Sequence, residues 1–241
     1  DVYKRQGLAN EPDASSPADL DEVIAYRSAY LSDYQDQAYA QRYRRLVERV
    51  RKFEQELRPA ANTELPLTTA VARNYFSLLA YKDEYEIARL YSNGDFERRL
   101  AEQFEGDYRL RFHLAPPLLA KRDPHSGKLL KREFGGWMLP LLRVLARCRK
   151  LRGSALDIFG YTAERKMERE LITAYEADIE QLLLDTGPHN LDTAVEIANL
   201  PQQIRGFGHV KQAGIEAAAT RRAELLRKFS GLDPAVQIFK A

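Results

Sequence analysis

The alternation of apolar and polar positions predicts a mainly helical chain. From Leu20 to Leu57, apolar residues recur at steps of three and four, the period of one helix face. Ser16, Pro17 and Asp19 form a helix start, with a capping hydroxyl, a proline at the first helical position and a carboxylate near the positive end of the helix dipole. The same reasoning predicts helices over residues 68 to about 91, 95–104, 136–153, 162 to about 184, after residue 190, and from about 209 to 229.

One segment departs from the helical period. In "YRLRFHL", residues 108–114, apolar and polar side chains alternate, which is typical of a half-buried strand. The following "LLAKRDPHSGKLLKREF" places turn residues between two short runs, so we predict a β-hairpin around residues 107–134. The predicted fold class is therefore mainly α, a multi-helix domain with a small β-hairpin insertion.

Composition suggests how the chain is organised. Residues 7–16 have linker composition. We expect residues 17–58 to be the helical tail of a preceding domain, and residues 67–241 to form a helical C-terminal domain with the small β insertion. One codon choice for the first six residues, "DVYKRQ", spells the end sequence of a transposase used to prepare sequencing libraries. We therefore expect residues 1–6 to be a translated adapter and not native protein.

Charge and hydropathy restrict the class of protein. The hydrophobic fraction of 44% is enough for a core, and 37 basic against 35 acidic residues give no overall attraction to polyanions. No run approaches the ~20 apolar residues that span a bilayer, so we expect no membrane partner. The single cysteine, Cys148, excludes an internal disulfide and a cysteine-ligated metal centre within this chain. This pattern is typical of a cytoplasmic protein.

Charge is concentrated in one block. Between Lys121 and Arg152 the sequence has ten cations and two carboxylates. Such a patch could bind a phosphate-bearing cofactor, nucleic acid or an acidic protein, or it could be a solvated surface paired with acids elsewhere. Nucleic acid is not expected, because aromatic residues do not interleave with the cations. The candidate residues for binding an anion, coenzyme A or a partner are Arg147, Arg149 and Lys150.

A second group of cations surrounds a glycine turn. In "RGFGHVK", Arg205, His209 and Lys211 flank a turn that opens a helix, so backbone N–H groups and cations could converge on an anion. A helix-to-helix turn that needs two glycines explains the same residues without a ligand, and the pattern favours this explanation. "GFGHVK" is not a dinucleotide fingerprint, and the four histidines show no metal-ligand spacing.

A third segment concentrates acidic residues. "AYKDEYEIARLY" contains Lys82, Asp83, Glu84 and Glu86. Two carboxylates could share acid–base work if their surroundings separated their pKa values. On an amphipathic helix the pattern instead favours a solvated face with pairs such as Glu86 with Arg89. We therefore predict no catalytic residue and no metal ligand in this chain.

Three segments resemble a known family. "AYKDEYEIARLY", "FEGDYRLRFHLAPPLLAKRDPHSGKLLKREFG" and "LPQQIRGFGHVK" together resemble the C-terminal region of bacterial fused indolepyruvate ferredoxin oxidoreductases, of the 2-oxoacid:ferredoxin oxidoreductase family. The resemblance extends from about Asp19 to Phe229. It implies an enzyme that oxidatively decarboxylates aryl 2-oxo acids, passes the acyl group to coenzyme A and reduces ferredoxin, with thiamine diphosphate and iron–sulfur clusters as cofactors.

The cofactor motifs of that family are not in this chain. The diphosphate signature begins Gly-Asp-Gly, which "GDF" and "GDY" do not meet, and the cysteine runs that hold clusters are missing. The resemblance thus implies that upstream domains hold both cofactors and that this part alone is inactive. We expect it to hold no cofactor, to pack against those catalytic domains and to help dimerisation. The alternative is a stand-alone helical adaptor without catalysis.

Overall fold

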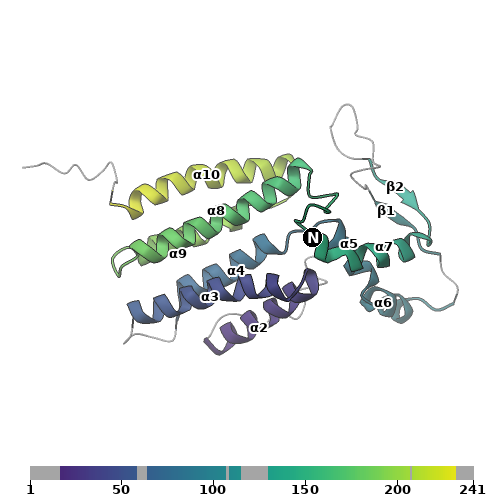
Figure 1. Cartoon of the computed structure of the whole chain (residues 1–241), viewed down its shortest axis with the longest axis horizontal. Helices are drawn as coiled ribbons and strands as arrows, with labels where there is room; N and C mark the ends of the chain where they lie inside the picture. Colours follow the sequence, from purple (N-terminus) through teal and green to yellow (C-terminus); the bar gives the residue numbers. More distant parts are fainter. Residues whose placement is uncertain (1–16, 59–63, 107–108, 115–129, 207, 232–241) are drawn as a thin grey trace, which may run out of the picture. The chain divides into compact units, whose positions relative to one another are not determined.

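The computed structural model of the chain describes residues 17–58, 64–106, 109–114, 130–206 and 208–231, with side chains from residue 20 and without that of His209. The architecture is mainly helical with one small antiparallel sheet, as the sequence predicts (Figure 1). The described residues fall into two compact units. The first comprises residues 34–36 and 82–167, and the second comprises residues 17–33, 37–81 and 168–231.

Helices build the second unit almost completely. Its elements are α2 (Pro17–Tyr34), α3 (Gln37–Leu57), α4 (Pro66–Leu79), most of α8 (Ala163–Asp185), α9 (Leu191–Ala198), the 3-10 helix η2 (Leu200–Gln203) and α10 (His209–Phe229). The predicted helical stretch from Leu20 to Leu57 is thus two helices. The predicted starts of α2 at Pro17 and of α10 at His209 are confirmed.

Stacked tyrosines occupy the core of the second unit. The Tyr75 ring stacks on Tyr43 and on Tyr175, each at a centroid distance of 6.0 Å. The hydroxyls of Tyr43 and Tyr175 are satisfied, because the first donates to the Ala72 carbonyl at 3.1 Å and the second to the Ala198 carbonyl at 3.0 Å. Burying aromatic rings while pairing their hydroxyls joins the helices without leaving polar atoms unsatisfied.

A buried carboxylate of one helix caps the N-terminus of another. Glu54 of α3 is fully buried. It accepts hydrogen bonds from the backbone N–H groups of Leu67 and Thr68 at 2.9 and 2.8 Å, and from the Thr68 hydroxyl at 2.7 Å. These amides belong to the first turn of α4, whose N-cap residue, Leu65, has no capping side chain. Glu54 therefore supplies the missing cap and places a negative charge at the positive end of the helix.

The first unit combines short helices with the sheet. Its elements are α5 (Glu84–Ser92), α6 (Asp95–Gln103), β1 (Phe112–Leu114), β2 (Arg132–Phe134), α7 (Met138–Arg147) and the 3-10 helix η1 (Cys148–Leu151). The strands pair antiparallel, Phe112 opposite Phe134, which confirms a hairpin in the predicted region. The predicted strand from residue 108 is wrong in length, since β1 has three residues. The predicted turn between the strands lies outside the described residues.

A separate apolar cluster holds this unit together. It consists of Ala88 from α5, Phe112 from β1, and Met138, Leu142 and Ala146 from α7. The three α7 residues are spaced by four, so one side of that helix is buried. Pro140 lies in the first turn of α7, where the helix tolerates it.

The predicted helix from residue 68 to about 91 is wrong in one respect, because it is interrupted. The chain leaves the helix after Leu79, and α5 begins at Glu84 with Asp83 as its N-cap. The Asp83 carboxylate accepts from the Glu86 N–H, and this competes with continuing the helix. Beyond α5, Gly94 adopts a φ of 87°, which confirms the predicted helix stop at Asn93 and Gly94.

Within the part of the chain that the structure describes, no helix is both long enough and apolar enough to span a bilayer.

Candidate functional site

A network of buried polar side chains lies where α5 begins, in the first unit. Asp83 is almost fully buried, with 2% of its surface exposed. Its Oδ1 accepts the Glu86 N–H at 2.8 Å, which caps α5. A buried carboxylate with only this bond would be costly, because desolvation penalises the charged form.

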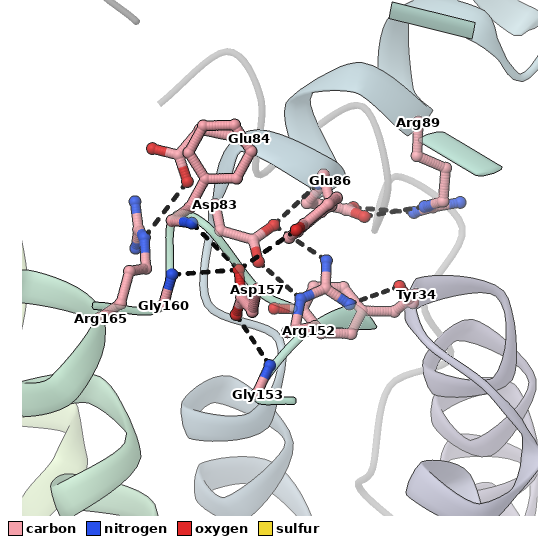
Figure 2. A network of polar contacts seen from close by, with 12 residues as sticks. Tyr34, Asp83, Glu84, Glu86, Arg89, Arg152, Gly153, Asp157, Gly160 and Arg165 are labelled. Carbon is pink, nitrogen blue, oxygen red and sulfur yellow. Dashed lines mark hydrogen bonds and ion pairs between the residues drawn. The ribbon is translucent and has the colours of Figure 1, made fainter. Parts of the chain in front are cut away.

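Arg152 supplies the opposite charge. Its Nε donates to Asp83 Oδ2 at 2.5 Å and its Nη2 to Oδ1 at 2.9 Å, a bidentate pair. Its Nη1 donates to the Tyr34 carbonyl at 2.6 Å, and its Cζ lies 3.6 Å from the centre of the Tyr34 ring. Figure 2 shows the guanidinium between Tyr34 and Asp83. Arg152 therefore ties the end of η1 to the start of α5 and to Tyr34.

Asp157 organises the loop that follows. One oxygen accepts the Gly153 N–H at 2.8 Å, and the other accepts the Gly160 and Phe159 N–H groups at 3.0 and 3.2 Å (Figure 2). The Tyr85 hydroxyl of α5 also donates to it, at 3.2 Å. Burial, and then the nearby Asp157 charge, raise the pKa of Tyr85, so this hydroxyl stays protonated. Asp157 thus holds the loop closed and joins it to α5.

The other acidic residues of the segment are also paired. Glu86 and Arg89 form the predicted pair, bidentate with two distances of 2.8 Å. The expectation of a solvated face is wrong, because Glu86 is only 3% exposed. Glu84 lies 3.5 Å from Arg165, and burial raises the pKa of its carboxyl. Burial likewise lowers the pKa of Lys82.

This arrangement of paired carboxylates is suited to stabilising the fold. The oxygens of Asp83 and Asp157 already accept hydrogen bonds from fixed donors. A general acid or base has to exchange a proton with a substrate, and these oxygens face their own chain instead. Within the described residues, no group of three or more His, Cys, Asp and Glu side chains could hold a metal ion.

The predicted basic patch is divided between different roles. Lys121, Arg122 and Lys128 lie outside the described residues. Arg152 is buried against Asp83 and is therefore not part of a surface patch, and Arg143 pairs with Glu97 at 2.5 Å.

The three candidates on this side lie at the end of α7 and in η1. Arg147 and Lys150 are exposed, and Arg149 is half-buried. All three belong to the first unit and follow one another within four residues. The three residues therefore lie close together along the chain, and two of them, Arg147 and Lys150, are on the surface.

The candidates around the glycine turn are used differently. Lys211 donates to Glu168 at 2.7 Å in a mostly buried pair, and the Arg205 Nε donates to the Gln202 carbonyl at 2.8 Å. The side chain of His209 lies outside the described residues. These residues belong to the second unit.

The geometry of the turn accounts for its first glycine. Gly206 has a φ of 86°, and an added Cβ would lie 2.9 Å from Val210 Cγ1. The turn therefore requires glycine at position 206, with or without a bound anion.

The central network was missed by sequence reasoning. The sequence pattern places Asp83 on a helix surface and Arg152 among a cluster of cations, and it gives no signal for Asp157. The Asp-x-x-Glu pattern of Asp83 and Glu86 is a capping signal that could have located the helix start. Nothing local in the sequence indicates that Arg152, 69 residues away, would neutralise it.

Comparison with known proteins supports one assignment. The sequence model of a family described as a family of unknown function, DUF6537, matches residues 20–224, which is most of the chain. The chain belongs to the DUF6537 family. No curated protein and no solved structure matches it. The family match contains the segment of Asp83, Arg152 and Asp157, so the buried network lies inside the family region.

Proposed function

We propose that the chain is the C-terminal part of an oxidoreductase that converts aryl 2-oxo acids such as indolepyruvate to acyl-coenzyme A, with reduction of ferredoxin. The support is the ordered resemblance of three segments, all of which lie within the matched residues 20–224. The role proposed for this part is structural or docking, and not catalytic.

The cysteine content of this chain does not fit the iron–sulfur clusters of such an enzyme. An iron–sulfur cluster is usually held by four thiolates, and the chain has one cysteine, Cys148. The acidic residues around Asp83 are occupied within the fold. Thiamine diphosphate and the clusters would therefore be bound by upstream domains of the parent enzyme, and no step of the reaction is assigned to this chain.

One observation carries the structural role. The two carboxylates that the sequence suggests for acid–base work are buried and already form ion pairs. Asp83 pairs with Arg152, and Glu86 pairs with Arg89. Groups fixed in this way stabilise a fold, while the exposed Arg147 and Lys150 remain on the surface for contact with another molecule.

The decisive experiment uses the complete open reading frame that contains this sequence. We expect it to encode a Gly-Asp-Gly motif and clustered cysteines upstream. The purified full-length protein should reduce ferredoxin when supplied with indolepyruvate, coenzyme A and thiamine diphosphate. A complete reading frame without those motifs, or a full-length protein without this activity, would contradict the proposal.

The role of the exposed cations is tested in the same full-length enzyme. If Arg147, Arg149 and Lys150 contact coenzyme A phosphates or acidic ferredoxin, reversing them to glutamate should raise KM for that substrate with little change in kcat. Unchanged kinetics for both would remove this part of the proposal. The same test applies to Arg205, while Lys211 is excluded from it because it is paired with Glu168.

A stand-alone helical interaction module is the second candidate. The observation that favours it is the row of exposed apolar side chains on α7, since such patches commonly mark interaction sites.

A further inference from the structure

Helix α7 is apolar on two sides. Met138, Leu142 and Ala146 are buried in the core cluster of the first unit. Trp137, Leu141 and Val144 are exposed, with 64%, 53% and 56% of their surfaces accessible. These three are spaced by four and three residues, so they form one stripe along the helix, about 10 Å long. We call Trp137, Leu141 and Val144 the α7 stripe.

Contacts with β2 and with the residues before α7 hold one member of the α7 stripe, Trp137, in place. The Trp137 ring packs edge-on against Phe134 of β2, with centroids 6.0 Å apart. A Cβ added at Gly135 would lie 3.4 Å from Trp137 Cδ1, so the indole rests close to the backbone there. An exposed side chain that is already held in place loses less conformational freedom when a partner binds.

Positive charge lies at one end of the stripe. Arg147 follows Val144 by three residues, which makes it a neighbour on the helix surface, and Lys150 lies just beyond. From Phe134 to Leu156 the sequence contains no carboxylate. The two other cations whose partners are known, Arg143 and Arg152, are paired with Glu97 and Asp83. Arg147 and Lys150 therefore give the exposed end of the stripe its charge.

This combination limits what can cover the stripe. A second copy of the chain, docked through the same face, offers these cations no opposite charge from α7 and η1, because residues 134–156 contain no carboxylate. Aromatic residues and arginine are enriched where proteins bind other proteins, and the rim of such interfaces is polar. A partner that presents carboxylates beside apolar side chains would satisfy both parts of the surface.

We propose that the α7 stripe, with Arg147 and Lys150, is a docking surface for an acidic protein segment that carries apolar anchor residues. The anchors pack on Trp137, Leu141 and Val144, and the carboxylates meet the two cations. This inference does not depend on the proposed redox function, because it rests on the surface of this chain alone.

The test uses the full chain and three synthetic helical peptides, with binding measured by fluorescence anisotropy. The first peptide has leucines along one face and glutamates beside them. The second has lysines in place of the glutamates, and the third has glutamines in place of the leucines. The first should bind at least about tenfold more tightly than either of the others, because it alone offers both apolar burial and opposite charge.

Variants of the chain locate the binding. The double variant Leu141→Glu/Val144→Glu should weaken binding of the first peptide more than about tenfold, through lost apolar burial and added repulsion. The variant Arg147→Glu/Lys150→Glu should weaken it about fivefold or more and reduce its salt dependence. All four side chains are exposed, so circular dichroism should show an unchanged helix content.

Matched controls come from the second unit. Leu184→Glu changes a leucine of α8 that is 81% exposed, and Arg227→Glu reverses an exposed cation of α10. Both should bind the first peptide like the unchanged chain.

Four outcomes would overturn the proposal. They are no binding of the first peptide, equal binding by the Leu141→Glu/Val144→Glu variant, a dimer in sedimentation that this variant abolishes, and binding of the chain to phosphatidylserine vesicles that requires the stripe. The third outcome would assign the stripe to a second copy, and the fourth to an anionic membrane.

Discussion

Each unit contains a buried carboxylate that caps the N-terminus of a helix, and the two differ in what balances their charge. Asp83 caps its own helix α5 and pairs with the Arg152 guanidinium. Glu54 caps the neighbouring helix α4 and receives its hydrogen bonds from two backbone N–H groups and a hydroxyl. The first charge is balanced by one cation, whereas the second is balanced by several dipoles.

The difference affects how each unit depends on single residues. Removing one partner of a buried ion pair leaves an uncompensated charge, so the first unit relies on Arg152. The dipoles that hold Glu54 come mostly from the backbone, which substitution does not remove. We therefore expect the start of α5, in the first unit, to be more sensitive to the loss of one charged partner than the start of α4, in the second.

The largest effect is expected at Arg152. Arg152→Met should lower the free energy of unfolding by about 3–5 kcal/mol, because Asp83 stays buried without its cation. Urea unfolding measures the loss, and hydrogen exchange should show faster exchange at residues 153–160. Arg49→Met is the control, since Arg49 and Glu180 are both about half exposed, and it should cost less than about 1 kcal/mol.

The second-largest effect is expected at Asp157, a buried carboxylate of the first unit that accepts hydrogen bonds from backbone N–H groups, as Glu54 does in the second unit. Asp157→Ala leaves the N–H groups of Gly153, Phe159 and Gly160 without their acceptor. A loss of about 3 kcal/mol is expected from unsatisfied buried donors, measured by urea unfolding. Faster hydrogen exchange should be confined to the loop and α5. A loss below that of Arg49→Met would show that the loop is held by other contacts.

Glu54 supplies the corresponding test in the second unit. Glu54→Gln keeps the size of the side chain but replaces one accepting oxygen with a donor. It should cost about 1–2 kcal/mol, because at least one donor of Leu67 or Thr68 loses its acceptor. Thermal unfolding measures this, and exchange at the first turn of α4 should rise. If Glu54→Gln costs more than Arg152→Met, the contrast between the two units is wrong.

The smallest effect is expected at Asp21, an exposed residue of the second unit. The hydrogen bond from Arg51 lowers the pKa of the Asp21 carboxyl. A lowered pKa contributes stability above the unfolded value of about 3.9, and this contribution is lost as the pH falls through the folded pKa. Asp21→Asn should therefore cost below about 0.5 kcal/mol at pH 7 and less at pH 2–3. Equal costs at both pH values, in parallel urea titrations, would contradict this.

The sequence was informative where structure depends on neighbouring residues. The proline at a helix start, Pro17, the glycine stop at Gly94 and the charged helix from about His209 to Phe229 are predicted from local signals, and the structure confirms them. The hairpin was also predicted from alternation, and Phe112 does pair with Phe134.

The remaining features depend on contacts that are distant in the sequence. The start of α5 has a local capping signal at Asp83, but the pairing of Asp83 with Arg152 across 69 residues has none. Glu54 caps a helix from 13 residues away. In the candidate site, the exposure of Arg147 and Lys150 agrees with a surface role, while burial removes Arg152 from that surface. Charge alone could not separate these cations, because burial depends on the complete fold.

The central claim is that the charges of Asp83 and Arg152 stabilise each other in the fold, and a double-mutant cycle tests it most directly. Asp83→Asn, Arg152→Met and the double variant are compared by urea unfolding, with Asn chosen because it can still cap α5. The double variant should be at least about 1 kcal/mol more stable than the sum of the single losses predicts, since it removes both charges together. Losses that simply add would show that the two charges do not stabilise each other, and would contradict the account.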